Sequence, residues 1–384
     1  MDRRHFCASL AALPVLAFAT PTYAAPAGKP GGGYDRLLIL IELKGGNDGL
    51  NTLIPYADAE YRRLRPRLAI AREQIVQLTE SAGLHPALAG LKPLWDGGEL
   101  AWVQGLGYPE PNLSHFRSIE IWDSASDSQE YLADGWLARQ FKQLPPPASF
   151  AAEGVSVATD DLGPLSGARA ISLSDPAQFV NRARLVHAAT TPANGALAHI
   201  LKVGGDIRTA AEGLNSRTEF KVEFPRHRFG QSCQTVARVA AGRNVAVLRI
   251  SHGGFDTHAN QLNSHERLLR ELSEGLTALR AALIEQGLWD RSLIMSYAEF
   301  GRRAQENGNG GSDHGTAAPH FVLGGSVKGG LYGQAPSLAR LEGGNLVHTV
   351  DFRSLYATVI ERWWGADSQR VLGSRFVPLD FVSS

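Results

Sequence analysis

Several short apolar runs divide the chain, and each ends in glycine or polar residues. The run YDRLLILIEL covers residues 34–43 and opens into KGGNDGLNT. The runs NVAVLRIS, residues 244–251, and RSLIMSYAEF, residues 291–300, have a similar composition. Continuous runs of this length, rich in leucine and β-branched residues, are typical of parallel strands that are buried on both faces.

Between these runs, some apolar residues recur with the period of a helix, and others form short runs typical of strands. We expect helices near residues 85–96 and 262–286, a strand at 100–104 and another in HFVLGG, residues 320–325. The segment DFRSLYATVIERWWG, residues 351–365, predicts a closing amphipathic helix with Leu355, Val359 and Trp363 on one face. Strands that alternate with helices indicate crossover connections and therefore an α/β fold with a mostly parallel sheet.

Residues 145–235 break this alternation. They open with PPPASFAAEG and continue with mixed polar segments, so we expect an insertion or cap on a single domain that spans residues 34–384. Because substrate specificity would lie in this insertion, which carries no motif, the sequence does not name a substrate.

The N-terminus resembles an export signal. Arg3 and Arg4 precede the apolar run CASLAALPVLAFAT, which ends in small residues, so we expect residues 1–25 to be a twin-arginine signal peptide and 26–33 a linker. An ordinary secretory signal is the alternative. The run is too short to span a bilayer, which predicts no permanent membrane anchor. The translocase is then a partner during export to the periplasm or beyond.

Composition narrows the choice of partners. The 384 residues include 38 basic and 38 acidic side chains, so no net field attracts nucleic acid. Cys233 is the only cysteine after the leader, which excludes an intramolecular disulfide in a mature chain.

Acidic and imidazole side chains follow the predicted strands. Asp48, Asp256 with His258, and Glu299 each follow a different strand, and His314 lies in a glycine-rich loop. Carboxylates gathered at one sheet edge repel one another unless a cation neutralises them, so we predict one or two divalent metal ions, Zn, Mn or Ca. The alternatives are local: Asp48 could cap a turn, and Glu299 could pair with a nearby arginine.

The segment GYPEPNLSHFRSIEIW, residues 107–122, offers a nucleophile. Ser114 stands at the expected N-cap of a helix, where free backbone amides attract anions, and Arg117 could contact ester oxygens. Asn112 and His115 are the expected substrate-binding residues. Two alternatives stay open: Ser114 only caps the helix, or Ser114 and His115 form a metal-free acyl hydrolase, although no G-x-S-x-G motif is present.

In order along the chain, the motifs KGGNDGLNT, GYPEPNLSHFRSIEIW, HGGFDTHANQ, AEFGRR and SDHGTAAPHFVLGG resemble the bacterial family called domain of unknown function 1501. The resemblance covers nearly the whole chain after the leader. That family is grouped with the alkaline phosphatase and sulfatase superfamily. The resemblance implies an alkaline-phosphatase-like three-layer sandwich that binds one or two divalent metals and hydrolyses phosphate or sulfate esters.

Residue by residue, the resemblance assigns Asp48 as the first metal ligand and Ser114 as the nucleophile. Asp256 and His258 resemble a pair that shares one metal, and His314 resembles the final histidine ligand. At the remaining position Glu299 and Phe300 replace an Asp-His pair, which removes one imidazole.

The sequence thus predicts an exported metal-dependent hydrolase of phosphate or sulfate esters, with metal ligands Asp48, Asp256, His258, Glu299 and His314. The alternative is a non-catalytic periplasmic binding or assembly protein on the same scaffold, which the missing imidazole at Phe300 favours.

Overall fold

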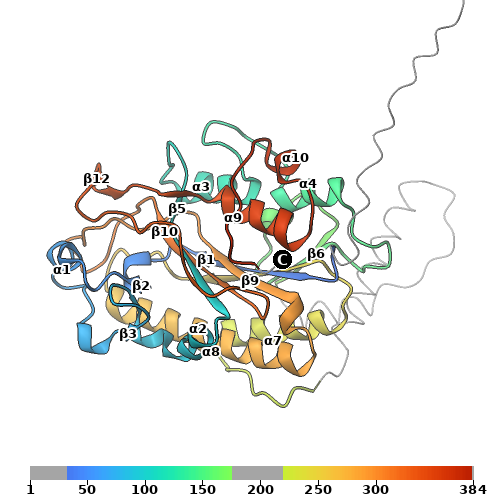
Figure 1. Cartoon of the computed structure of the whole chain (residues 1–384), viewed down its shortest axis with the longest axis horizontal. Helices are drawn as coiled ribbons and strands as arrows, with labels where there is room; N and C mark the ends of the chain where they lie inside the picture. The colour runs from blue at the N-terminus through green and yellow to red at the C-terminus, as the bar shows by residue number, and fades with distance from the viewer. Residues whose placement is uncertain (1–32, 175–218, 383–384) are drawn as a thin grey trace, which may run out of the picture.

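The computed structural model describes residues 33–174 and 219–382. A central β-sheet lies between two layers of helices (Figure 1). Its strands run in the order β11-β5-β10-β9-β1-β8-β6-β7, and β14 pairs with β5. β10 is antiparallel to both of its neighbours, and the other pairs are parallel. The fold is therefore the expected mixed α/β sandwich with a mostly parallel sheet.

Strand β1, Leu37–Lys44, shows why the apolar runs are continuous. Ile39 and Ile41 pack into the core on one face of the sheet, and Leu38 and Leu40 pack into the core on the other. Successive side chains of a strand point to opposite faces, so a strand covered on both sides is apolar at most positions of both faces.

The two helical layers close these cores. α7, Arg228–Ala241, and α8, Gln261–Glu285, cover one face, while α3, His115–Ser124, α4, Trp136–Gln143, and α9, Arg353–Thr358, cover the other (Figure 1). The predicted closing helix is α9 continued by a π-helical turn, η6, Val359–Trp363.

The remaining strands of the central sheet are β5, Leu100–Gly107; β6, Gly154–Val157; β7, Ala170–Leu173; β8, Val247–Gly253; β9, Ser292–Tyr297; β10, Ala318–Leu323; β11, Gly330–Tyr332; and β14, Val350–Asp351. Short strands outside it are β2, Leu53–Ile54; β3, Val76–Gln77; β4, Gly83–Leu84; β12, Leu341–Glu342; and β13, Asn345–Leu346. The short helices are η1, Gly49–Asn51; α1, Ala59–Leu64; η2, Arg72–Gln74; η3, Pro86–Leu91; α2, Lys92–Asp96; η4, Gly163–Leu165; η5, Trp289–Arg291; and α10, Ser368–Leu372.

Part of the segment 145–235, expected as an insertion or cap, belongs to the main layers. β6 and β7 extend the sheet beyond β8, and α7 packs against α8. The hydrophobic pattern of the sequence did not predict β6 and β7, because each strand has only four residues. Residues 175–218, which make up much of the expected cap, lie outside the described residues, as do the leader and most of the linker.

In the part of the chain that the structure describes, no helix has both the length and the apolar character to cross a bilayer.

Candidate functional site

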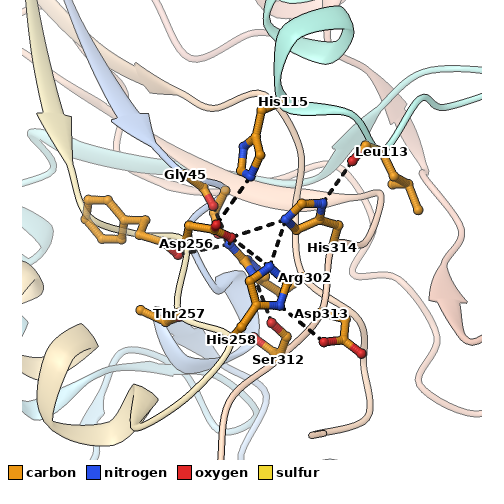
Figure 2. Close-up of polar contacts among 12 residues, drawn as sticks. Gly45, Leu113, His115, Asp256, Thr257, His258, Arg302, Ser312, Asp313 and His314 are labelled. Carbon is orange, nitrogen blue, oxygen red and sulfur yellow. Dashed lines mark hydrogen bonds and ion pairs between the residues drawn. The ribbon is translucent and has the colours of Figure 1, made fainter. Parts of the chain in front are cut away.

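Three imidazoles and one carboxylate converge at the carboxyl end of β8. We call His115, Asp256, His258 and His314 the histidine cluster (Figure 2). Asp256 and His258 lie on the loop after β8, His115 is the first residue of α3, and His314 comes from the loop between β9 and β10. Parallel strands end at one edge of the sheet, and this edge is where open α/β folds bind ligands.

A glycine lets two backbone segments meet beneath the cluster. Gly45, directly after β1, has φ +114°, and a Cβ there would lie 2.4 Å from the backbone nitrogen of Asp256. A side chain at this position would push the Asp256 loop away from the sheet, because L-residues rarely adopt such a φ and no room exists for the atom.

The nitrogens that face the centre of the cluster are all Nε2 atoms. His258 Nε2 lies 3.0 Å from Asp256 Oδ1, and His314 Nε2 lies 3.2 Å from the same oxygen. The two Nε2 atoms are 3.0 Å apart. His115 Nε2 lies 3.4 Å from Asp256 Oδ2.

Each imidazole uses its other nitrogen to hold an acceptor. His115 Nδ1 donates to Glu299 Oε1 at 2.8 Å, and His258 Nδ1 donates to Asp313 Oδ1 at 3.2 Å. His314 Nδ1 donates to the carbonyl of Leu113 at 2.9 Å (Figure 2). Because these acceptors carry no proton to give, a neutral ring keeps its proton on Nδ1 and turns the lone pair of Nε2 toward the cluster.

Arg302 is the cation in direct contact with the cluster. Its side chain is fully buried, and Nη2 donates to Asp256 Oδ1 at 2.6 Å. The carbonyls of Gly45, Gly46 and Phe255 also accept from this guanidinium, as does that of Ser312. Arg302 is therefore fixed in place by the backbone and does not depend on Asp256 for its position.

This environment keeps Asp256 ionised. Partial burial opposes ionisation, but the hydrogen bond and charge of Arg302 outweigh it and lower the pKa of Asp256 to about 2. Burial is the main cause that lowers the pKa of His314 below its ordinary value, so this ring favours the neutral form.

Glu299 lies beside the cluster and supports it. Its two oxygens accept from the backbone N–H of Gly45 at 2.9 and 3.1 Å, and Oε1 also accepts from His115. The carboxylate is buried. Glu299 thus orients His115, whereas the sequence predicted it as a direct metal ligand.

Asp48 belongs to a second, fully buried group, which we call the Asp48 network. Its Oδ2 accepts from Arg65 and from Gln261, and the side chains of both Asp48 and Arg65 have no exposed surface. Burial opposes ionisation, but the charge and hydrogen bond of Arg65 outweigh it and lower the pKa of Asp48. The network also includes Asn47, whose Oδ1 accepts from His265 Nε2 at 2.8 Å.

The structure therefore places Asp48 apart from the histidine cluster, although Gln261 links the two groups. Gln261 Oε1 accepts from Ser312 Oγ at 2.6 Å, and the carbonyl of Ser312 accepts from Arg302. The reason for the separation is charge: Arg65 already supplies the cation that the sequence analysis assigned to a metal.

The segment before α3 holds the predicted nucleophile. Ser114 occupies the N-cap position and is exposed, but its hydroxyl makes no capping hydrogen bond. Instead, Asn112 Oδ1 accepts from the backbone N–H of Ser114 at 2.8 Å. The capping alternative for Ser114 thus has no hydrogen bond to support it. The side chain of Ser114 also makes no hydrogen bond with His115 among the described residues, as the acyl-hydrolase alternative would require.

Arg117 contacts the loop that follows α3. Its Nη2 donates to the carbonyls of Asp127, Ser128 and Glu130, and its guanidinium lies 3.8 Å from the ring centre of Tyr131. The side chain is therefore engaged in fixing the loop that follows α3. This placement differs from the expected contact with an ester.

Two residues in contact with the cluster were not among the predicted site residues. Arg302 and Asp313 contact the cluster, and His115, expected to bind substrate, faces Asp256 with its Nε2. The motif SDHG placed Asp313 next to His314, which was a usable signal. Nothing in the sequence indicated Arg302, because the motif AEFGRR does not distinguish a buried arginine from an exposed one.

The donor set fits a divalent metal. His115, Asp256 and His314 each offer a ligand atom within 4.8 Å of the others, and His258 Nε2 is closer still to two of them. Tetrahedral N and O ligands of Zn²⁺ are about 3.3 Å apart. With neutral imidazoles, lone pairs of His258, His314 and Asp256 face one another at 3.0–3.2 Å, an arrangement that a cation stabilises.

The formal charges agree with one dication. Asp256, Glu299 and Asp313 contribute three negative charges within the hydrogen-bonded cluster, and Arg302 in contact with it contributes one positive charge. The net formal charge of the cluster is therefore −2, which one divalent ion would neutralise. Nδ1 hydrogen bonds to carboxylates and carbonyls are also the usual support of metal-binding histidines.

The fold and the site together define an α/β protein with a polar, metal-type cluster at the carboxyl edge of its sheet. Over residues 101–374 the chain matches the family described as protein of unknown function DUF1501, and it belongs to that family. No curated protein matches the chain.

Similar solved structures belong to the alkaline phosphatase and sulfatase class. A protein in the alkaline phosphatase superfamily from Vibrio parahaemolyticus has 8% identity and a TM-score of 0.43, covering 88% of this chain and 69% of that one. The PsFucS1 sulfatase from Pseudoalteromonas sp. has 12% identity and a TM-score of 0.39, covering 90% and 70%. A Mg-bound mutant of TAB5 alkaline phosphatase has 10% identity and a TM-score of 0.35, covering 79% and 94%. At such identities the likeness concerns the fold alone.

Proposed function

We propose that this protein is a metal-dependent hydrolase of phosphate or sulfate esters. The observation that carries the proposal is the convergence of three Nε2 lone pairs on the ionised carboxylate of Asp256. His115, Asp256, His258 and His314 would hold the ion. A divalent cation there would stabilise the negative charge that develops on the ester oxygens during hydrolysis.

In this proposal Ser114 is the nucleophile. Its hydroxyl is exposed, uncommitted to the helix cap and one residue from His115. Ser114 Oγ would bond to phosphorus or sulfur while the ester oxygen leaves as an alcohol with the proton that the serine gives up. Water would then hydrolyse the seryl ester and restore the hydroxyl. Asn112 holds the Ser114 backbone in the N-cap conformation through its Oδ1.

A non-catalytic binding or assembly protein remains the second candidate. Arg302 favours it, because its permanent hydrogen bond to Asp256 Oδ1 competes with a metal for that oxygen. In that case the cluster would bind a cation without turnover.

The first test is elemental analysis of protein purified without chelator, together with hydrolysis of a panel of nitrophenyl phosphates and sulfates. We expect about one divalent ion per chain, and hydrolysis that a chelator abolishes and added metal restores. Asp256→Asn should lose the ion, because it removes the charge at the centre of the cluster. Ser114→Ala should keep the ion and lose hydrolysis.

The matched control for Asp256→Asn is Asp48→Asn, since both remove the carboxylate that follows a strand. The control should retain the ion in its folded fraction, because Asp48 contacts Arg65 and Gln261. Stoichiometric metal without hydrolysis of any ester would favour the binding protein. Hydrolysis that is indifferent to chelators would favour the acyl hydrolase of Ser114 and His115.

We also propose that residues 1–25 direct export by the twin-arginine route. The support is the sequence MDRRHF followed by an apolar run and small residues. Replacing Arg3 and Arg4 by lysine should leave the protein in the cytoplasm with its leader uncleaved. Export of the lysine variant at the normal level would indicate an ordinary secretory signal.

A further inference from the structure

A cavity lies at the same edge of the sheet as the histidine cluster. Its volume is about 450 Å³, and it is bounded by the ends of β1 and β8, by the start of α7 and by the first turns of α8. Three basic side chains line it, namely Lys44, Arg228 and Arg267, and Glu271 is the one carboxylate among its lining residues.

Counting only partners in residues 33–174 and 219–382, the basic side chains of the cavity keep donors that are not used. Lys44 makes no hydrogen bond or ion pair through its side chain within residues 33–174 and 219–382. Arg228 uses Nη2 on the carbonyl of Ala158, and Arg267 pairs through Nη1 with Glu271 at 2.9 Å. The lining therefore carries a formal charge of +2 once Glu271 is counted against the three cations. An excess of unpaired positive charge in a hollow favours an anionic ligand.

The wall between these side chains is suited to a polar ligand. His252 is buried, donates Nε2 to the carbonyl of Leu268 at 3.1 Å, and lies tilted against Phe229 with ring centres 4.5 Å apart. Burial lowers the pKa of His252 to about 4, so the ring is neutral at pH 7 and offers Nδ1 as an acceptor. Ser251 and Thr159 add hydroxyl groups to the lining.

The cavity and the histidine cluster are neighbours along two adjacent strands. Lys44 pairs in register with Gly253, and both line the cavity. The next residue after Lys44 is Gly45, whose N–H binds Glu299, and Asp256 is three residues beyond Gly253. Three residues span at most about 11 Å, so one ligand of sugar size can reach from the cluster into the cavity.

The backbone between the cavity and the histidine cluster is open to solvent at Gly253. Gly253 is exposed, and a Cβ built there would meet no atom within 4 Å. The backbone at this point thus leaves room for a ligand to cross from Asp256 to Lys44.

We propose that this cavity is a second anion-binding subsite, and that the substrate carries a further negatively charged group besides the ester that is cleaved. The inference rests on the proposed function, because the first anionic group is the ester at the histidine cluster. Lys44 and Arg228 bind the second group, and Gly253 provides the passage. The substrate class is then an ester of a polyanionic molecule, such as a multiply phosphorylated or sulfated sugar.

Binding of two probes that differ by one charged group tests the subsite. Titration calorimetry would compare glucose 1-phosphate with glucose 1,6-bisphosphate on the metal-loaded protein carrying Ser114→Ala, so that neither probe is consumed. We expect the bisphosphate to bind at least about tenfold more tightly, as one further charge-assisted contact commonly provides. Adding Lys44→Ala should bring this ratio close to one, and Lys44→Arg should preserve most of it.

The control is Lys142→Ala, which removes an exposed lysine of α4 that pairs with Asp134. This variant should leave the ratio unchanged. Arg228→Gln is a second variant that removes a charge from the cavity, and it too should lower the ratio. Circular dichroism checks that each variant is folded.

Equal affinity for the two probes would overturn the subsite, and so would a preference that survives both Lys44→Ala and Arg228→Gln. Failure of the proposed function looks different. In that case unsubstituted protein lacks a stoichiometric metal or chelator-sensitive hydrolysis, a result that does not involve Lys44 or Arg228.

Discussion

Two aspartates that follow neighbouring parallel strands have opposite surroundings. Asp48 follows β1, is fully buried, and is neutralised by the buried guanidinium of Arg65. Asp256 follows β8, has 43% of its side chain exposed, and faces three imidazole Nε2 atoms. A position directly after a strand therefore does not decide the role of a carboxylate. Asp48 is structural, whereas Asp256 can bind a ligand.

The difference lies in where the counter-charge comes from. Arg65 donates to Asp48, to the carbonyl of Ala304 and to that of Arg303, so the chain itself neutralises and encloses the first carboxylate. Asp256 also contacts an arginine, Arg302, but part of its side chain stays exposed and faces the Nε2 atoms of the three imidazoles. A carboxylate with that combination is available for a cation from solution.

The strongest way to break the Asp48 network is Arg65→Met. This substitution leaves the Asp48 carboxylate buried without its cation, which costs about 3–5 kcal/mol of folding free energy. Urea unfolding of the metal-free protein measures the loss. Metal content per folded chain should stay the same, because no ligand of the histidine cluster changes.

Arg63→Ala is the control for that prediction. Arg63 lies on α1, two residues before Arg65, and forms an exposed ion pair with Glu60. We expect no measurable change in stability, because solvent screens an exposed ion pair. An equally small loss for Arg65→Met would mean that Asp48 does not depend on its arginine, and the contrast between the two aspartates would disappear.

Glu299→Gln sharpens the comparison from the side of the histidine cluster. The substitution removes the charge that accepts from His115 Nδ1 but keeps an oxygen for the N–H of Gly45. Loss of such a supporting carboxylate weakens metal affinity by about 10–100-fold. Competition with a chromophoric chelator measures the affinity. Unchanged affinity would show that His115 is not a metal ligand.

The sequence was sufficient for the architecture but not for the roles of individual carboxylates. Continuous apolar runs predicted β1, β8 and β9, because each is covered on both faces. The runs also predicted that Asp48, Asp256 and Glu299 follow these strands. Their roles depend on contacts that no local pattern encodes, such as Arg65 with Asp48 and Arg302 with Asp256, where the partners are 17 and 46 residues apart.

Acid should weaken the fold through the Asp48 network. Burial lowers the pKa of His265 to about 3, from an ordinary value near 6.5. Between these two values the unfolded chain binds a proton that the folded chain does not, so stability is complete above pH 6.5 and falls as the pH drops toward 3. His265 alone should contribute about 2 kcal/mol to the loss between pH 7 and pH 5.

Urea unfolding of the metal-free protein at pH 7 and pH 5 checks this prediction. In His265→Gln the amide can still donate to Asn47, but it does not titrate, so the dependence on pH should become shallower. A slope identical to that of the unsubstituted protein would assign the acid sensitivity to other groups.

The smallest effect is expected for Asp313→Asn. Asp313 supports His258 as Glu299 supports His115, but its side chain is 51% exposed and its hydrogen bond to His258 is 3.2 Å long. Asn307 also donates to the same oxygen at 3.0 Å, and an asparagine can keep that contact. Water and the remaining amide oxygen replace most of what is lost, so metal affinity should fall by less than about tenfold, measured by the same chelator competition. A loss as large as that of Glu299→Gln would mean that charge, and not burial of the supporting carboxylate, controls the affinity of the cluster.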